Sequence, residues 1–202
     1  SYGLLDRYYI DLSLRNDASS KFPPKHRNAL FWSAGIKWNA KKEAFLSDVS
    51  WLDRLDVKIS TGPAGNSAGL GSYDFYATAG VSNPYRGEPS RVIYDPGNPA
   101  LTWEKQQKTT LGFDVRLFDL LGINLELYDR RTTDMVMDVP YPYTTGISTN
   151  TQNVGTYQNR GFDFRVDVDV WKGRRGNYAS VYGNINYNRD KVLELFQGLD
   201  TW

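Results

Sequence analysis

The feature that most constrains the fold is the segment Arg160 to Trp171, which reads RGFDFRVDVDVW. Apolar and charged residues alternate in it without a break. The apolar set is Phe162, Phe164, Val166, Val168 and Val170, and the charged set is Asp163, Arg165, Asp167 and Asp169. Because successive side chains of a β-strand point to opposite faces, one face is apolar and the other is charged. Either a soluble sandwich or a transmembrane β-barrel could use such a strand.

The same alternation recurs in six other segments, which with the first are spread along the chain from residue 7 to residue 188. Their lengths are close to the roughly 9–11 residues that a tilted membrane-spanning strand needs. We therefore predict an all-β chain with about seven strands. The predicted strands lie within residues 7–15, 29–38, 54–61, 109–118, 122–131, 160–171 and 178–188.

The connections between these strands alternate between long and short. The long ones are rich in Gly, Pro, Ser, Asn and Tyr and cover 16–28, 61–103 and 135–159, whereas the shorter ones cover 39–53, 118–122 and 172–177. This alternation is typical of an antiparallel up-and-down outer-membrane barrel, with long extracellular loops and short periplasmic turns. A Greek-key sandwich would not sort its loops in this way, and such long loops are uncommon in compact soluble domains.

The sequence therefore favours a transmembrane barrel wall, with the apolar faces toward lipid and the charged faces toward the lumen. The alternative is a soluble or surface glycan-binding β-sandwich module. Within the 39–53 link, residues 41–52 (KKEAFLSDVSWL) have apolar positions at helical spacing and predict a helix.

Composition excludes several other functions. The 24 Lys and Arg residues nearly balance the 23 Asp and Glu residues, so the basic excess of a nucleic-acid binder is missing. The chain has no cysteine and one histidine, His26, which we expect in a surface loop. We therefore predict no metal site and no cofactor. No run of about 18 apolar residues occurs, so no transmembrane helix is predicted.

Four stretches, in order along the chain, resemble one known family. They are RYYIDLSLRNDASSKF (7–22), WLDRLDVKISTGPAGN (51–66), NPALTWEKQQKTTLGFDV (98–115), and RRTTDMVMDVPYPYTTG (130–146) followed by NVGTYQNRGFDF (153–164). Each is similar to a segment of the SusC/RagA family of TonB-linked, or TonB-dependent, outer-membrane transporters. Ala18, Thr61, Pro63 and Asp163 depart from the family patterns.

The resemblance implies that residues 1–202 are a partial β-barrel domain, from the C-terminal half of a larger plugged barrel. It places no separate plug or TonB-box segment within them. An odd number of strands cannot close a bacterial barrel alone. Residues 192–202 then read as the start of another external loop and not as a terminal strand.

The resemblance also implies a role in nutrient import across the outer membrane of a Gram-negative bacterium, with oligosaccharides or peptides as substrates. The implied partners are a SusD-like lipoprotein over the extracellular mouth, TonB through the N-terminal region, and outer-membrane lipid. Neither enzyme activity nor nucleic-acid binding is implied.

Aromatic residues in the long loops are the candidate contacts for a ligand or partner, because flat rings stack on sugar faces and on apolar surfaces. They are Tyr73, Phe75, Tyr76, Tyr85, Tyr94, Tyr141 and Tyr143. By contrast, Trp32, Trp38 and Tyr187 fall on the apolar faces of strands, and we expect them to lie at the membrane interface or against lipid.

The charged set Asp163, Arg165, Asp167 and Asp169 is expected to face the lumen, where charges on neighbouring strands balance it. No catalytic residue is nominated. A surface glycosidase would need two carboxyl groups at a controlled separation, and acidic residues are spread over most of the predicted strands.

Overall fold

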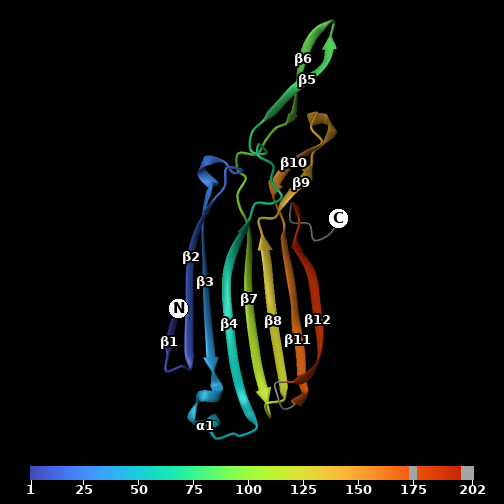
Figure 1. Ribbon diagram of the computed structural model, residues 1–202. Coiled ribbons are helices and arrows are strands. Elements are labelled where there is room, and N and C mark those ends of the chain that lie inside the picture. The colour runs from blue at the N-terminus through green and yellow to red at the C-terminus, as the bar shows by residue number, and fades with distance from the viewer. Residues whose placement is uncertain (173–176, 197–202) are drawn as a thin grey trace.

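The computed structural model describes residues 1–172 and 177–196 (Figure 1). Its main feature is one antiparallel sheet of eight strands in the order β1-β2-β3-β4-β7-β8-β11-β12. Neighbours in this sheet follow one another along the chain, apart from two hairpins inside the loops, so the topology is up-and-down. The strands are β1 (Tyr2–Leu4), β2 (Tyr8–Ala18), β3 (Asn28–Asn39), β4 (Leu52–Asn66), β7 (Glu104–Leu117), β8 (Leu121–Thr133), β11 (Thr156–Lys172) and β12 (Tyr178–Glu194).

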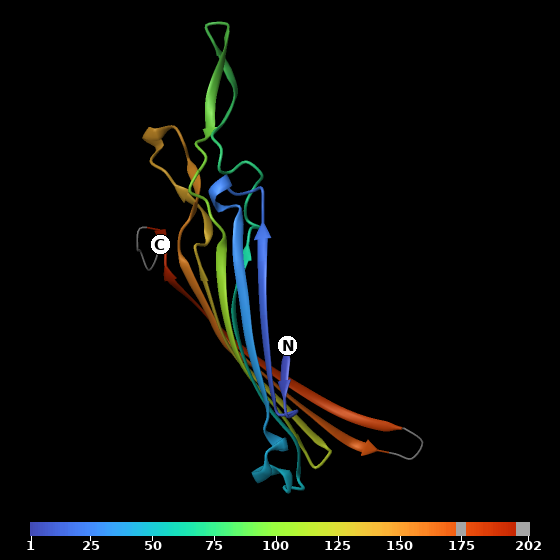
Figure 2. The same ribbon diagram turned by 90° about the vertical axis from the view of Figure 1, so that its left-hand side faces the viewer.

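The sheet is a single curved layer (Figure 2). Over the described ranges the only other sheets have two strands each, so no second large sheet packs against it as a sandwich would require. This finding confirms the predicted antiparallel arrangement of long strands and argues against the sandwich alternative. In the part of the chain that is described, no helix is long and apolar enough to cross a membrane.

The long loops contain structure that the sequence analysis did not predict. The hairpin of β5 (Thr78–Tyr85) and β6 (Glu88–Asp95) projects beyond the sheet (Figure 1). A second hairpin, of β9 (Val136–Pro140) and β10 (Thr149–Asn153), lies between the first hairpin and the loop end of the sheet. The short 3₁₀ turn η1 (Pro24–His26) lies in the loop between β2 and β3, and η3 (Tyr143–Thr145) lies between β9 and β10. These strands were missed because they are short and carry Pro and Gly, which read as loop signals.

At the opposite end, the β3–β4 link holds η2 (Ala40–Lys42) and the four-residue helix α1 (Ala44–Ser47). The prediction of a helix over 41–52 was therefore too long. The Nζ of Lys41 donates to the carbonyl oxygens of Leu46, Ser47 and Val49 at 2.9, 3.1 and 2.7 Å. This lysine satisfies carbonyls that the helix end leaves free, and it holds the link as a compact turn.

Some strands are longer than predicted. β2 continues to Ala18, β4 continues to Asn66, and β12 continues to Glu194. The segment 192–202 therefore begins as strand and not as loop, and residues 197–202 lie outside the described part of the chain. β1 was also missed, because three residues are too few to show an alternation.

The strand register aligns the apolar residues of successive strands into rows. One row crosses seven strands through directly paired residues: Tyr8, Trp38, Val57, Phe113, Leu125, Phe164 and Ile185. Along individual strands the apolar positions span nine residues, as in 30–38, 162–170 and 179–187, which fits a tilted membrane crossing. Side chains on this face stay exposed within the chain, such as Leu12 at 73% and Ile185 at 61%. We call this surface the apolar face.

Aromatic side chains gather at the short-turn end. Trp51 and Phe118 have ring centroids 6.4 Å apart and are both exposed. A bulge after Asp169 leaves Val170 without a cross-strand partner and brings Trp171 opposite Ala179, on the apolar face. Girdles of aromatic residues at the membrane interfaces are a feature of outer-membrane barrels.

Candidate functional site

The face opposite the apolar face, which we call the polar face, carries a ladder of ion pairs across strands. The Nζ of Lys37 lies 3.0 Å from a carboxylate oxygen of Asp56, and Lys58 pairs with Asp114, which also accepts a hydrogen bond from Asn124. The register places Lys37 opposite Lys58 and Asp56 opposite Asp114. Because like charges directly opposite repel, the pairs join diagonally and each charge meets its opposite.

Asp56 is the most deeply buried member of this ladder. The residue is 4% exposed, and its Oδ1 has no hydrogen-bond partner in the described part of the chain. Its other oxygen depends on Lys37. The carboxylate is therefore sensitive to the loss of that one cation.

We expect Lys37→Met to destabilise the folded protein by about 2 kcal/mol, because it leaves a buried acceptor without its partner. Urea unfolding of the full-length protein in lipid vesicles measures this change. The matched control is Lys42→Met, since Lys42 and Asp6 are both exposed and 3.8 Å apart. That control should change stability by less than about 0.5 kcal/mol, and equal effects of the two substitutions would contradict the role given to Lys37.

The four charged residues predicted on β11 share the polar face with this ladder. At the short-turn end, Arg116 Nη2 lies 2.5 Å from a carboxylate oxygen of Asp169, and its Nη1 lies 3.9 Å from Asp167. The guanidinium is thus flanked by two acids from the neighbouring hairpin. This arrangement balances charge and does not isolate a carboxyl pair for acid–base chemistry.

The other two charged residues of β11 contact β12. Asn186 Nδ2 donates to Asp163 at 2.6 Å, and the guanidinium carbon of Arg165 lies 4.8 Å from the ring centroid of Tyr182. That all four residues face a lumen stays a prediction, which the shared polar face supports.

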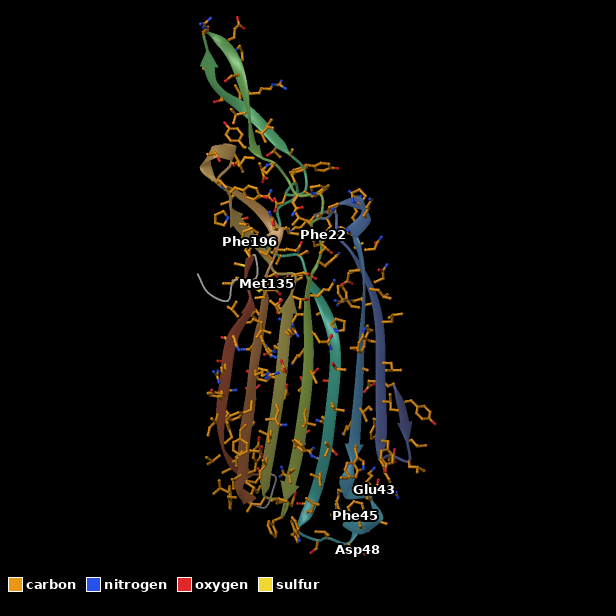
Figure 3. All side chains as sticks on the ribbon, turned by 180° about the vertical axis from the view of Figure 1, so that it is seen from behind. Phe22, Glu43, Phe45, Asp48, Met135 and Phe196 are labelled. Atoms are coloured by element: carbon orange, nitrogen blue, oxygen red, sulfur yellow. The ribbon has the colours of Figure 1, made fainter. Side chains whose placement is uncertain are left out.

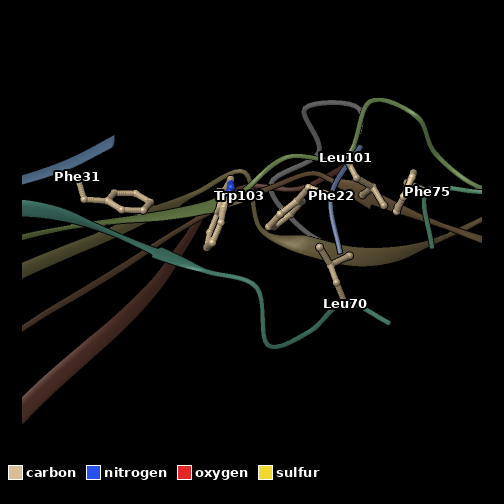
Figure 4. Packing of buried hydrophobic residues seen from close by; sticks show 6 residues of the cluster. All are labelled: Phe22, Phe31, Leu70, Phe75, Leu101 and Trp103. Atoms are coloured by element: carbon tan, nitrogen blue, oxygen red, sulfur yellow. The ribbon is translucent and has the colours of Figure 1, made fainter. Parts of the chain in front are cut away.

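The loop end of the sheet holds a buried aromatic cluster, which we call the loop core (Figure 4). The ring centroid of Trp103 lies 4.7 Å from that of Phe22 and 5.9 Å from that of Phe31, and its Nε1 donates to the carbonyl oxygen of His26 at 3.0 Å. Phe31 belongs to β3, whereas the other members come from loops. The loop core consists of Phe22, Phe31, Leu70, Phe75, Leu101 and Trp103. It fixes the first two long loops to the sheet.

The family-like stretch 98–105 is the hub of these loops. Asn98 Nδ2 donates to the carbonyl oxygen of Thr151 at 3.0 Å. Asn153 accepts from the backbone N–H of Thr102 and donates to its carbonyl oxygen, both at 2.8 Å, and it also donates to the carbonyl oxygen of Asp134. The sequence analysis used this stretch only for its resemblance and missed its structural role. The available signal was the presence of two large apolar residues, Leu101 and Trp103, in a loop segment that begins with Asn and Pro, since such residues indicate a buried loop.

Three of the predicted aromatic contacts follow β4 in one loop. Phe75 is 7% exposed within the loop core, so its ring contributes to packing and offers little surface to a ligand. Tyr76 lies against it with ring centroids 4.1 Å apart and is 53% exposed, and Tyr73 is 69% exposed. Tyr73 and Tyr76 therefore keep ring surface available for a ligand or partner.

The remaining candidates lie on the hairpins. The ring of Tyr94 covers Gly80, so that a Cβ added there would collide with the ring, and the Tyr94 hydroxyl donates to the carbonyl oxygen of Val81. Tyr141 is partly exposed, and its hydroxyl accepts a hydrogen bond from Gln152 at 3.0 Å. Among the described residues, the ring contacts join Tyr76 to Phe75 but join neither Tyr94 nor Tyr141 to Tyr73 or Tyr76. The side chains of Tyr85 and Tyr143 lie outside the described residues.

His26 has a structural partner. Its Nδ1 lies 2.9 Å from the carbonyl oxygen of Leu101, and the residue is half-buried. It lies in a loop, as the sequence suggested, and it helps to join the η1 loop to the stretch 98–105.

At the short-turn end, Glu43 ties the β3–β4 link to the sheet (Figure 3). It accepts hydrogen bonds from the hydroxyl of Tyr8 at 2.5 Å and from Nε1 of Trp38 at 3.2 Å, and Arg7 lies 3.2 Å away. The pKa of Glu43 is lowered below its ordinary value. The hydrogen bond from Tyr8 is the largest cause, and the hydrogen bond from Trp38 and the positive charge of Arg7 add to it. The link thus depends on an ionised carboxylate.

This pKa predicts a pH dependence. A lowered pKa in the folded protein contributes stability above the ordinary glutamate value of about 4.3, and that stability is lost as pH falls through the folded-state pKa. We expect Glu43→Gln to lower the midpoint of thermal unfolding at pH 7 and to make little difference once Glu43 is protonated in the wild type. A midpoint difference that stays constant as the pH is lowered through this range would contradict this role.

Comparison with known proteins identifies the family. Residues 1–200 match the family described as "TonB dependent receptor-like, beta-barrel". TonB-dependent receptor P3 of Formosa agariphila is 28% identical over 99% of this chain and 20% of its own length, and TonB-dependent receptor SusC of Bacteroides thetaiotaomicron is 28% identical over 100% and 21%. The chain therefore spans about a fifth of the length of these relatives.

A solved structure agrees with the sequence comparisons. The RagAB peptide importer in its "closed-closed" state superposes with a TM-score of 0.88 and 36% identity, over 98% of this chain and 22% of that chain. Proteins of this family are receptors and transporters, so the prediction that the chain is not an enzyme is confirmed. The chain belongs to the TonB dependent receptor-like β-barrel family of the Gram-negative outer membrane, and it is of the SusC/RagA type.

Proposed function

We propose that this chain forms one arc of the wall of a larger, plugged barrel that imports nutrients across the outer membrane. The observation that carries this proposal is the long antiparallel sheet, with a continuous apolar face on one side and a ladder of ion pairs on the other. Transporters of this kind close with about 22 strands around a plugged lumen. The eight strands here would supply part of that wall.

The first test is the intact mass of the denatured polypeptide that carries these residues in cells, because it shows whether they belong to a longer chain that could form the rest of the barrel. A mass several-fold above the 23.0 kDa of these residues is expected. A mass of 23.0 kDa would contradict the proposal, because eight strands in an open sheet would leave both edge strands unpaired within the membrane.

We further propose that the imported ligand is a peptide or an oligosaccharide. The structural match to RagAB, which is described as a peptide importer, supports a peptide. The exposed rings of Tyr73 and Tyr76 suit either a sugar face or an apolar side chain. We also propose a SusD-like lipoprotein over the extracellular mouth, where the β5–β6 hairpin projects, and TonB as the energy-coupling partner acting through an N-terminal region.

Uptake by cells tests this function. Cells that express the full-length protein are supplied with a labelled peptide pool or a labelled oligosaccharide pool. We expect accumulation of one pool, and its loss when either the receptor or TonB is deleted. Accumulation that survives both deletions would overturn the import function, and uptake of neither pool would overturn the substrate class.

A further inference from the structure

A basic cluster lies on the lipid-facing side of the sheet at its loop end. The last apolar row at this end contains Phe162 and Tyr187, whose stacked rings have centroids 5.8 Å apart. Two residues further along each strand on the same face, Arg160 of β11 lies directly opposite Arg189 of β12. The following position on the same face pairs Gln158 with Lys191 on one side and with Arg131 of β8 on the other. We call Arg131, Arg160, Arg189 and Lys191 the basic cluster.

The charge of this cluster is poorly balanced within the chain. Asp129 lies 2.7 Å from Nε of Arg160 and also accepts from Gln158. In the ranges that the structure describes, no carboxylate forms an ion pair with Arg131, Arg189 or Lys191. Two arginines directly opposite across a strand pair repel each other, so the arrangement favours an external anion.

The geometry provides room for that anion. Gln158, Arg160, Arg189 and Lys191 line an open cavity of about 270 Å³, and the three basic residues are exposed. The cavity presents an amide, two guanidinium groups and an ammonium group at one spot. Arginine forks bind phosphate oxygens in pairs, and lysine adds a point charge.

The position of the cluster selects the source of the anion. One strand step of two residues separates Arg160 from Phe162, a rise of about 7 Å along the strand. The cluster therefore lies just outside the apolar band, at the depth of lipid headgroups, on the side with the long loops. Basic clusters at this depth bind anionic headgroups. The ion pairs of the polar face, by contrast, satisfy most of their charges within the chain.

We propose that the basic cluster binds the phosphate groups of a phosphorylated glycolipid in the outer leaflet of the membrane. The adjoining apolar face would contact the acyl chains of the same molecule. The contact anchors the wall in the outer leaflet and is independent of the ligand that the barrel transports.

Lipopolysaccharide binding to the full-length protein in detergent tests the proposal. The wild type should bind lipopolysaccharide at least about tenfold more tightly than its dephosphorylated form, and the double variant Arg189→Gln, Lys191→Gln should lose roughly tenfold or more in affinity. The matched control is Arg91→Gln, Lys25→Gln, which removes two exposed charges from the loops and should bind as the wild type does.

Three results would overturn the proposal. They are wild-type affinity in the Arg189, Lys191 double variant, equal binding of phosphorylated and dephosphorylated lipopolysaccharide, and inorganic phosphate binding as tightly as lipopolysaccharide. The last would indicate a site for free phosphate. Heat-modifiable migration on a gel shows that each variant is folded, and the comparison of the two lipopolysaccharide forms needs only the wild type.

Discussion

Val166→Arg is expected to destabilise the membrane-inserted protein by about 2–4 kcal/mol, which is the cost of an arginine at mid-bilayer depth on the lipid face of a barrel. Val166 lies at the centre of the nine-residue apolar run of β11, between Ile123 of β8 and Gly183 of β12. Neither neighbour offers a counter-charge, and lipid offers no water. Urea unfolding of the full-length protein in vesicles measures the change.

Two control variants show whether the loss of stability comes from a charge on the apolar face or from any substitution in these strands. Asn186→Arg places the same side chain on the polar face of the neighbouring strand β12, opposite Asp163, and should be much better tolerated. Asp167→Asn should fold normally, because it removes one of several acids around Arg116. Normal folding of Val166→Arg together with failure of Asp167→Asn would mean that the two faces are inverted.

Trp103→Ala is expected to have the second large effect, a loss of about 3–5 kcal/mol from the local stability of the extracellular loops. Trp103 is 6% exposed, packs on Phe22 and Phe31, and donates to the carbonyl oxygens of His26 and Arg27. Its removal leaves a cavity, and the carbonyl oxygens of His26 and Arg27 lose the indole N–H that donates to both of them. Limited proteolysis should cleave loop 67–103 faster in the variant, while the barrel stays folded.

The control for this prediction is Tyr73→Ala in the same loop. Tyr73 is 69% exposed, so its truncation should leave the rate of loop cleavage close to that of the wild type. Equal cleavage rates of Trp103→Ala and the wild type would contradict the account of the loop core as the element that fixes the loops.

The sheet was largely predictable from the sequence because its signal is local. The alternation from Phe162 to Val168 assigns each residue to a face without knowledge of any neighbouring strand, and the register of β8 and β12 agrees with it. At Trp171 this local rule failed. The bulge after Asp169 brings Trp171 to the apolar face, and bulges depend on how two strands meet.

The loop residues were less predictable because burial in a loop depends on distant partners. Phe75 and Tyr76 are adjacent aromatic residues and look alike in sequence. Only the packing with other loop-core residues from distant segments separates them, and it buries Phe75 while Tyr76 stays exposed. Similarly, Asn153 gives no local sign of its three hydrogen bonds to Thr102 and Asp134.

The orientation of the wall is the central claim, and a cysteine scan of β11 tests it most directly. The 202 residues contain no cysteine, so single cysteines at positions 162–169 can carry a spin label in the full-length protein, with any cysteine elsewhere replaced. We predict that collision with lipid-soluble oxygen peaks at positions 162, 164, 166 and 168, and that collision with a water-soluble nickel complex peaks at 163, 165, 167 and 169. Equal accessibility at all positions, or the opposite phase, would contradict the account.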